Sequence, residues 1–288
     1  MSFSQNVKEE LAGHMSPARH CQLAELAAMM HFCGQYGRDR EGRYTIGFQT
    51  ENEAVSRKGF TLLKKTYNID TDVGIDEEQM REFLLKIGNP EEPVSPLLIK
   101  NSCCQRAFLR GAFLCAGSIS NPTKGYHLEF VCTDVEKAKQ LQKVLQGFSI
   151  EAKIVLRKKY YVVYLKEGES IVDLLNVCEA HVALMEFENL RILKEMRNSI
   201  NRRVNCEAAN ITRTVNAAAR QIEDIEYIRD YGGLRMLPDN LREMAEVRLE
   251  YPDASLKELG EYLDPPVGKS GVNHRLRKLS EFAEKLRT

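Results

Sequence analysis

Residues 26–34 read LAAMMHFCG and residues 109–117 read LRGAFLCAG, and these two stretches decide the fold. Each is rich in apolar and small residues, as in a buried helix, and each ends on a glycine. The two glycines, Gly34 and Gly117, lie 83 positions apart. Similarity at a fixed spacing indicates one structural unit written twice. Because small residues let two backbones approach closely, we expect the two helices to pack along a pseudo-twofold axis.

The same succession of elements follows each of these helices. For the two copies in turn, it comprises an alternating strand at 44–50 and 126–132, a helix with one polar face at 53–67 and 135–148, and a strand pair ending at 84–88 and 164–168. A further strand is expected directly after each glycine. The sequence therefore predicts an αββαββ unit twice, over residues of about 23–88 and 106–168.

This order resembles the LAGLIDADG fold of homing endonucleases, in which two such helices form a central seam and two saddle-shaped sheets hold DNA. The resemblance implies an α+β pseudo-dimer within residues 1–195. In these nucleases the acid just before each motif glycine holds divalent metal at the scissile phosphates. The matching residues are Cys33 and Ala116, and neither a thiol nor a methyl group suits Mg²⁺. We therefore expect a degenerate domain with no catalytic or metal-binding residues, the alternative being a metal-dependent homing-type endonuclease.

The expected saddle carries opposite charges in its two copies. The charged residues of the two hairpins are Lys153, Arg157, Lys158 and Lys159 in the second copy, and Asp70, Asp72, Asp76, Glu77 and Glu78 in the first. An acidic hairpin repels the phosphates of DNA. A solvated surface, a retained DNA contact and the docking of a regulatory protein partner all remain open for this domain.

The overall composition indicates a two-domain protein that is cytoplasmic. The chain has 288 residues, of which 43% are hydrophobic and 28% charged, and its formal net charge is zero. A chain of this length exceeds one ordinary core. It has no apolar run of the roughly 18 residues needed to cross a bilayer, and its first residues lack the pattern of a signal peptide. We expect no membrane association.

The eight cysteines do not predict a metal or cofactor site. They are Cys21, Cys33, Cys103, Cys104, Cys115, Cys132, Cys178 and Cys206. None forms a C-x-x-C pair, and the adjacent Cys103 and Cys104 offer poor geometry for chelation. Most have apolar neighbours, where cysteine usually acts as a small hydrophobic residue.

Two basic segments stand out against the zero net charge. Residues 197–220 hold five basic residues against one acid, and residues 265–288 hold six against two, which indicates a localised phosphate-binding face. Residues 196–233 are expected to form a basic linker and a long helix. The helix should run from Ala208 to Ile228, with an apolar stripe for packing, and end at Gly232-Gly233. Upstream, residues 201–206 are either a linker or a second DNA contact, which would use Arg202 and Arg203.

Residues 234–288 predict an all-α helix-turn-helix domain. A helix is expected from Pro238 to Glu250. Ser255 and Glu258 form a capping box that starts a second helix over 256–263. The final helix, from about Ser270, would be the recognition helix. Its candidate DNA-binding residues are Lys269, Ser270, Asn273, His274, Arg275, Arg277 and Lys278. The Ser and Asn side chains can bond base edges or phosphate, and the cationic side chains suit the backbone or a guanine.

Several strings along the chain resemble the WhiA family. They are N-R-x-x-N-C-E-x-x-N at 201–210, L-x-x-L-P at 234–238, P-x-x-S-L-x-E-L-G at 252–260, G-K-S-G-V-N-H-R-L at 268–276, and residues 106–130. The resemblance covers nearly the whole chain. It implies a LAGLIDADG-like domain without nuclease residues and a helix-turn-helix similar to the C-terminal domain of sigma factors.

The resemblance also implies a function. It implies a non-enzymatic, nucleoid-associated regulator that binds double-stranded DNA and controls transcription in sporulation, cell division or chromosome segregation of Gram-positive bacteria. A protein-interaction scaffold is a further alternative, in which the basic final helix does not reach DNA.

Overall fold

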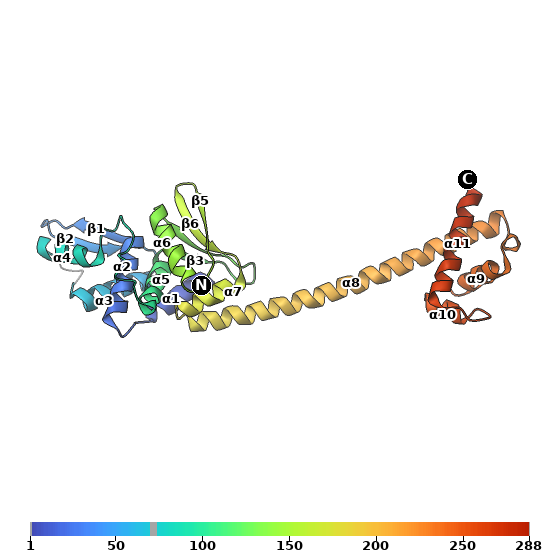
Figure 1. Ribbon diagram of the computed structural model, residues 1–288, viewed down its shortest axis with the longest axis horizontal. Coiled ribbons are helices and arrows are strands. Elements are labelled where there is room, and N and C mark those ends of the chain that lie inside the picture. The colour runs from blue at the N-terminus through green and yellow to red at the C-terminus, as the bar shows by residue number, and fades with distance from the viewer. Residues whose placement is uncertain (1, 70–73, 288) are drawn as a thin grey trace. The chain divides into compact units, whose positions relative to one another are not determined.

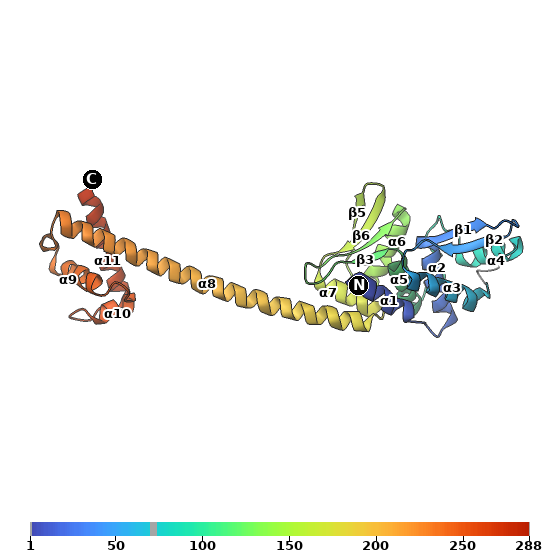
Figure 2. The same ribbon diagram turned by 180° about the vertical axis from the view of Figure 1, so that it is seen from behind.

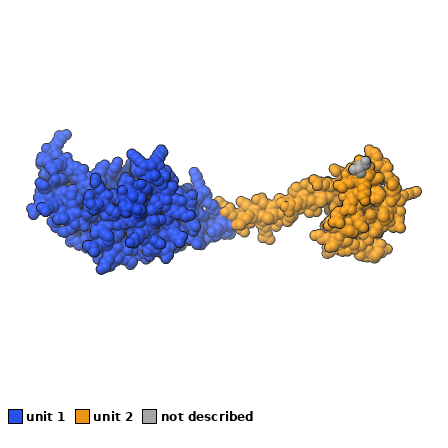
Figure 3. All heavy atoms as spheres, turned by 45° about the horizontal axis from the view of Figure 1, so that its top comes forward, with its two compact units in different colours: residues 1–196 blue, residues 197–288 orange. Residues whose placement is uncertain are grey.

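The computed structural model describes residues 2–69 and 74–287. The chain divides into two compact units, residues 1–196 and 197–288 (Figure 3). One helix, α8 (His181–Tyr231), runs through the boundary between them. Across the described residues, every helix is too short or too polar to span a lipid bilayer.

Two helices form the centre of unit 1, as the sequence predicts. They are α2 (Arg19–Cys33) and α5 (Ser102–Ala116), which lie side by side (Figures 1 and 2). Their backbones approach so closely at Gly111 that a Cβ atom there would lie 2.5 Å from the carbonyl oxygen of Glu25. The small residues on both helices therefore permit the contact that defines the seam.

The second copy of the repeat has the predicted order of elements. Its strands are β3 (Gly117–Ile119), β4 (Leu128–Cys132), β5 (Lys153–Arg157) and β6 (Tyr160–Leu165), which form an antiparallel sheet in the order β3-β4-β6-β5. Phe130 of β4 pairs with Gly117 on one side and with Val163 on the other. Helix α6 (Val135–Gln146) packs against this sheet, and α7 (Gly168–Val177) follows it.

The first copy departs from the prediction after its second helix. The hairpin of β1 (Gly34–Arg38) and β2 (Tyr44–Phe48) and the helix α3 (Glu53–Tyr67) are present, but the expected strand pair is replaced by α4 (Glu77–Ile87). Asp76 caps this helix by accepting a hydrogen bond of 2.8 Å from the backbone N–H of Gln79. Met80, Phe83 and Ile87 are buried at helical spacing. The prediction of strands was wrong because these local helix signals prevail.

The acidic residues of this segment consequently do not form a hairpin. Asp76 is the N-cap of α4, and Glu77 and Glu78 lie in its first turn, where negative charge stabilises a helix. Asp70 and Asp72 lie outside the described residues. An additional helix, α1 (Phe3–Gly13), begins at the capping box of Ser2 and buries its apolar side in the core of unit 1.

Unit 2 contains the helices expected for a helix-turn-helix. They are α9 (Asp239–Glu250), α10 (Leu256–Glu261) and α11 (Lys269–Arg287), preceded by the end of α8 and a short 3₁₀ helix at Leu234–Met236. The predicted capping box is confirmed, since the backbone N–H of Ser255 donates to Glu258 Oε2 at 2.8 Å. Pro238 is the N-cap of α9.

Helix α8 corrects two expectations for the preceding segment. It begins at His181 instead of the expected Ala208, so residues 201–206 are helical. Ile225 and Ile228 pack in the core of unit 2 as predicted. Ile211 and Val215 do not, because 65% and 58% of their surfaces are exposed. The apolar stripe is therefore a packing surface only at its C-terminal end.

Candidate nucleic-acid interface

The turn between α10 and α11 fixes the position of the final helix. The backbone N–H of Val267 donates to the carbonyl oxygen of Gly260 at 2.9 Å, which closes the chain back onto α10. Val272, Leu276 and Leu279 of α11 are buried in the core of unit 2. These contacts with α9 and α10 determine which side of α11 faces away from the unit.

Six of the predicted DNA-binding residues lie on that outward side of α11. They are Lys269, Ser270, Asn273, His274, Arg277 and Lys278, and all are exposed. Their positions repeat at helical spacing, so they form one strip that begins in the first turn of the helix. Backbone N–H groups of a first turn, together with the helix dipole, favour phosphate there. Arg277 lies 3.4 Å from Glu281, measured from Nε to Oε1, in a pair on the helix surface.

Arg275, which is also predicted to bind DNA, lies off this strip. Only 19% of its side chain is exposed, and its Nη1 lies 3.6 Å from Glu243 Oε2 of α9. The same nitrogen donates to the backbone carbonyl of Asn240 at 3.3 Å. Because these groups are on α9, Arg275 holds α11 against its neighbour.

Arg202 and Arg203 lie on α8, apart in sequence from the strip. Both are exposed. Arg202 Nε donates to the carbonyl oxygen of Asn198 at 3.3 Å, and Arg203 Nε lies 3.5 Å from Glu207 Oε1. These are weak surface contacts, so both guanidinium groups can turn toward a phosphate at little cost.

A small pocket beside Asn273 adds two cations, Arg213 and Arg248, that are not among the predicted site residues. It has a volume of about 210 Å³, and its lining includes Arg213 and Gln221 of α8 and Arg248 of α9. Arg248 is 3% exposed and donates from Nη1 to the carbonyl of Ala254 at 2.7 Å. Its Nε makes no hydrogen bond to any described residue, and burial lowers the pKa of its guanidinium. The basic run at 197–220 hinted at Arg213, but only packing brings that residue beside α11.

The positions that correspond to the nuclease metal ligands carry no carboxylate. Cys33 forms a disulfide with Cys115 at the C-terminal ends of α2 and α5, with 5.5 Å between the Cα atoms. The expectation that both cysteines act as small hydrophobic residues was therefore wrong. A polar pocket of about 730 Å³ lies beside them, and among the described residues that line it only Glu51 carries a carboxylate. The described residues of this pocket therefore do not provide the pair of facing carboxylates with which the nucleases hold metal.

Known domains match nearly the whole chain. A model of the WhiA N-terminal LAGLIDADG-like domain matches residues 19–81, a model of the WhiA LAGLIDADG-like domain matches residues 105–197, and a model of the WhiA C-terminal HTH domain matches residues 200–283. Both units are therefore covered, with the boundary between the last two models close to the boundary between the units.

Full-length relatives and a solved structure agree with these matches. Proteins of Lachnoclostridium phytofermentans and Alkaliphilus oremlandii, each named probable cell division protein WhiA, are 54% and 50% identical to the chain. The alignments cover 100% and 99% of this chain and 100% and 98% of the relatives. The crystal structure of full-length DUF199/WhiA from Thermatoga maritima is 29% identical, with a TM-score of 0.59 and 99% of both chains covered. The chain, with its degenerate LAGLIDADG-like seam and C-terminal helix-turn-helix, belongs to the WhiA family.

Proposed function

We propose that the protein is a sequence-specific regulator that binds double-stranded DNA through α11 and acts in cell division, chromosome segregation or sporulation. The observation that carries the proposal is the strip of six exposed polar and basic residues along α11. A helix that presents such a strip from a helix-turn-helix fits the major groove. The names of the relatives, which are cell division proteins, support the cellular role.

Within the strip, the residues would have different roles. Ser270 and Asn273 stand in the first turns of α11, the part of a recognition helix that contacts base edges. Arg277 and Lys278 lie further along and would neutralise backbone phosphates, which positions the helix without reading sequence. Arg202 and Arg203 of α8 are proposed as additional phosphate contacts. The protein would regulate transcription from the nucleoid, in the cytoplasm.

We propose that the LAGLIDADG-like unit does not cut DNA and serves instead to dock a regulatory protein. The disulfide of Cys33 and the methyl group of Ala116 occupy the positions where carboxylates would be required. The hairpin of β5 and β6 keeps its basic residues, but Arg157 is already paired, with Nη1 3.1 Å from Glu129 Oε2. That pairing reduces the charge available for a phosphate clamp.

The double variant Arg277→Ala/Lys278→Ala should weaken binding of the full chain to every duplex by a similar factor. Because phosphate contacts release counterions, the slope of log affinity against log salt should shrink by about one unit for each lost contact. Fluorescence anisotropy with a labelled duplex at several salt concentrations measures both quantities. The control is Lys139→Ala/Lys143→Ala, which removes the same charge from the exposed side of α6. Equal losses in the two double variants would argue against α11 as the DNA-contacting element.

Asn273→Ala should act on sequence preference more than on overall affinity. A lost bidentate contact to a base costs about 1–3 kcal/mol of discrimination at one position of the site. Selection of bound sequences from a random duplex library, compared with the parent chain, measures this preference. Unchanged preference at every position would show that α11 enters the groove in another orientation.

A further inference from the structure

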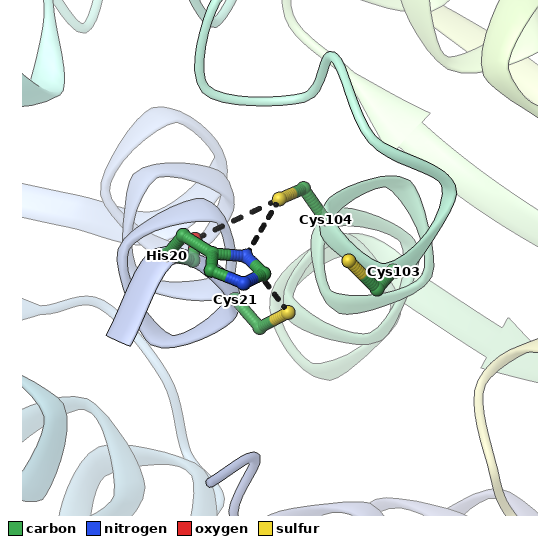
Figure 4. A group of neighbouring side chains, drawn as sticks. All are labelled: His20, Cys21, Cys103 and Cys104. Carbon is green, nitrogen blue, oxygen red and sulfur yellow. Dashed lines mark hydrogen bonds between the residues drawn. The ribbon is translucent and has the colours of Figure 1, made fainter. Parts of the chain in front are cut away.

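Four side chains with metal-binding chemistry converge at the N-terminal ends of α2 and α5. They are His20, Cys21, Cys103 and Cys104, and their ligand atoms all lie within 4.8 Å of one another (Figure 4). The Nδ1 atom of His20 is 3.2 Å from Cys104 Sγ and 3.3 Å from Cys21 Sγ. Cysteine and histidine, without carboxylates, are the ligands of structural zinc.

The internal repeat places the two pairs at matching positions of the two seam helices. His20 and Cys103 are separated by 83 positions, and so are Cys21 and Cys104, which is the spacing of the motif glycines. Each pair therefore occupies the same place in the first turn of its helix. Because the helices pack along a pseudo-twofold axis, the two adjacent pairs face each other. The adjacent Cys103 and Cys104 offer poor geometry for chelation by themselves, but α2 supplies the other two ligands.

We propose that these four residues bind one zinc ion in a closed Cys₃His site that joins the ends of the two seam helices. In a tetrahedral site with Zn–S of about 2.3 Å and Zn–N of about 2.0–2.1 Å, neighbouring ligand atoms lie roughly 3.5–3.8 Å apart. The two Nδ1–Sγ distances of 3.2 and 3.3 Å lie slightly below this range and no ligand pair is more than 4.8 Å apart, so small rotations of the side chains would complete the tetrahedron. Four protein ligands leave no open position, which makes the site structural rather than catalytic.

The surroundings act in two directions on the ligands and leave the ion a path from solvent. The ligands lie in the first turns of two helices of 15 residues each, whose dipoles favour negative charge, whereas burial raises the pKa of the Cys21 and Cys104 thiols, so binding of the ion would displace their protons. Cys21 and Cys104 are buried, whereas His20 and Cys103 are exposed. An ion can therefore reach the cluster from solvent through the exposed ligands, and the two buried cysteines would bind it on the inner side.

The site would have a definite mechanical consequence. It holds the N-terminal ends of α2 and α5, while the disulfide of Cys33 and Cys115 joins their C-terminal ends. The two seam helices would then be cross-linked at both ends, and release of the ion would free only their N-terminal ends. Loss of the ion would first loosen the residues at the N-terminal ends of α2 and α5. One of them is Arg19, which donates to the carbonyl of Thr66 at 2.6 Å.

Cobalt substitution in the full-length chain tests the proposal. The reduced, metal-free protein should bind one Co²⁺ per chain, with the strong visible bands of tetrahedral cobalt and a thiolate charge-transfer band. Zinc should displace the cobalt and abolish both. Cys103→Ser and His20→Ala change exposed ligands and should leave the fold intact, yet each should weaken cobalt binding at least about tenfold. Cys206→Ser, an exposed cysteine of α8, is the matched control and should leave binding unchanged.

Three results would overturn the proposal. The first is an absence of tetrahedral cobalt bands in protein whose thiols have been counted as reduced. The second is a disulfide among Cys21, Cys103 and Cys104, found by mass spectrometry in chain purified with zinc present. The third is an equal loss of binding in Cys206→Ser and Cys103→Ser.

Discussion

Replacement of Glu25 by alanine should destabilise unit 1 by about 3–5 kcal/mol, because it leaves two buried cations without their shared counterion. Glu25 lies on α2 with its side chain fully buried, and its Oε1 is 2.6 Å from Lys58 Nζ of α3 and 3.1 Å from Arg110 Nε of α5. This one carboxylate thus links three helices at the point where the seam is tightest. The loss is a large fraction of the stability of an ordinary domain.

The neighbouring groups replace Glu25 only in part. Lys58 also donates to the carbonyl of Leu11 at 2.7 Å, and Arg110 also donates to Glu179 Oε2 at 2.6 Å and to Ser16 Oγ at 2.7 Å. These contacts satisfy hydrogen bonds. However, Glu179 neutralises only the outer end of Arg110, so the charge of Lys58 would remain uncompensated in a buried environment.

The penalty of Glu25→Ala should decrease at alkaline pH. Burial lowers the pKa of Lys58 in the folded chain, and Glu25 opposes that shift. Without Glu25 the folded pKa falls further below the unfolded value. A base with a depressed folded pKa destabilises the fold fully below the folded pKa, and this cost is relieved as pH rises from the folded toward the unfolded pKa. The variant should therefore regain part of its stability in that interval.

Hydrogen exchange of peptides from α2 and α5, measured by mass spectrometry at several pH values, gives the opening free energy of the seam. Glu53→Ala is the control, since Glu53 forms a surface pair with Arg57 and should cost no more than about 1 kcal/mol. The triple variant Glu25→Leu/Lys58→Met/Arg110→Met removes all three charges and should recover most of the loss. If Glu25→Ala proved no more harmful than Glu53→Ala, the network would not stabilise the seam.

Gly260→Ala should destabilise unit 2 by about 2–3 kcal/mol, because α10 and the following turn leave no room for a side chain. A Cβ atom on Gly260 would lie 2.0 Å from the carbonyl oxygen of Val267 and 3.2 Å from Cγ2 of Val272. Overpacking of this kind costs roughly 1–3 kcal/mol, and the closeness of a backbone atom puts it at the upper end. The better helix propensity of alanine offsets less than about 1 kcal/mol.

The effect of Gly260→Ala should appear in both stability and DNA binding. A loss of this size in a domain of this length lowers the melting temperature by roughly 10–20 °C. Exchange of α9–α11 peptides should accelerate, while peptides of unit 1 should be unaffected. DNA affinity should fall as well, because the displaced turn sets the position of α11. Gly268→Ala, where a Cβ would meet no atom within 4 Å, should have a small effect. Equal effects of the two variants would mean that the close contact is not what holds the turn.

Much of the fold follows from short-range signals in the sequence. The seam helices are marked by small residues and a terminal glycine, and α10 by a capping box. The apolar positions 272, 276 and 279 determine which side of α11 is buried, and with it the outward strip. Even the continuity of α8 is compatible with its sequence, since residues 181–231 contain neither glycine nor proline. The predicted start at Ala208 was wrong, because apolar residues at intervals of four continue upstream through Val204, Ile200 and Met196 and the helix begins at His181.

The wrong strand prediction in the first copy arose because similarity to the second copy was given more weight than the local helix signals. The second copy of the repeat suggested strands over 84–88, although Asp76, Gln79 and the buried positions of α4 specify a helix. The orientation of the Arg275 side chain could not be predicted from local signals. Its place on the helix between the buried and the outward side allows either orientation, and Glu243 on α9 decides it.

The sequence by itself determined the duplicated seam, the second sheet, the three helices of the helix-turn-helix and the loss of the nuclease carboxylates. Each of these depends on residues a few positions apart, on the return of one such pattern 83 positions later, or on the identity of one residue at a motif. Only the tertiary structure decided that Glu25 meets Lys58 and Arg110, that Cys33 joins Cys115, and that His20 and Cys21 face Cys103 and Cys104. Such encounters depend on how helices rotate and approach when they bury their small residues, and no local pattern of side chains specifies that geometry.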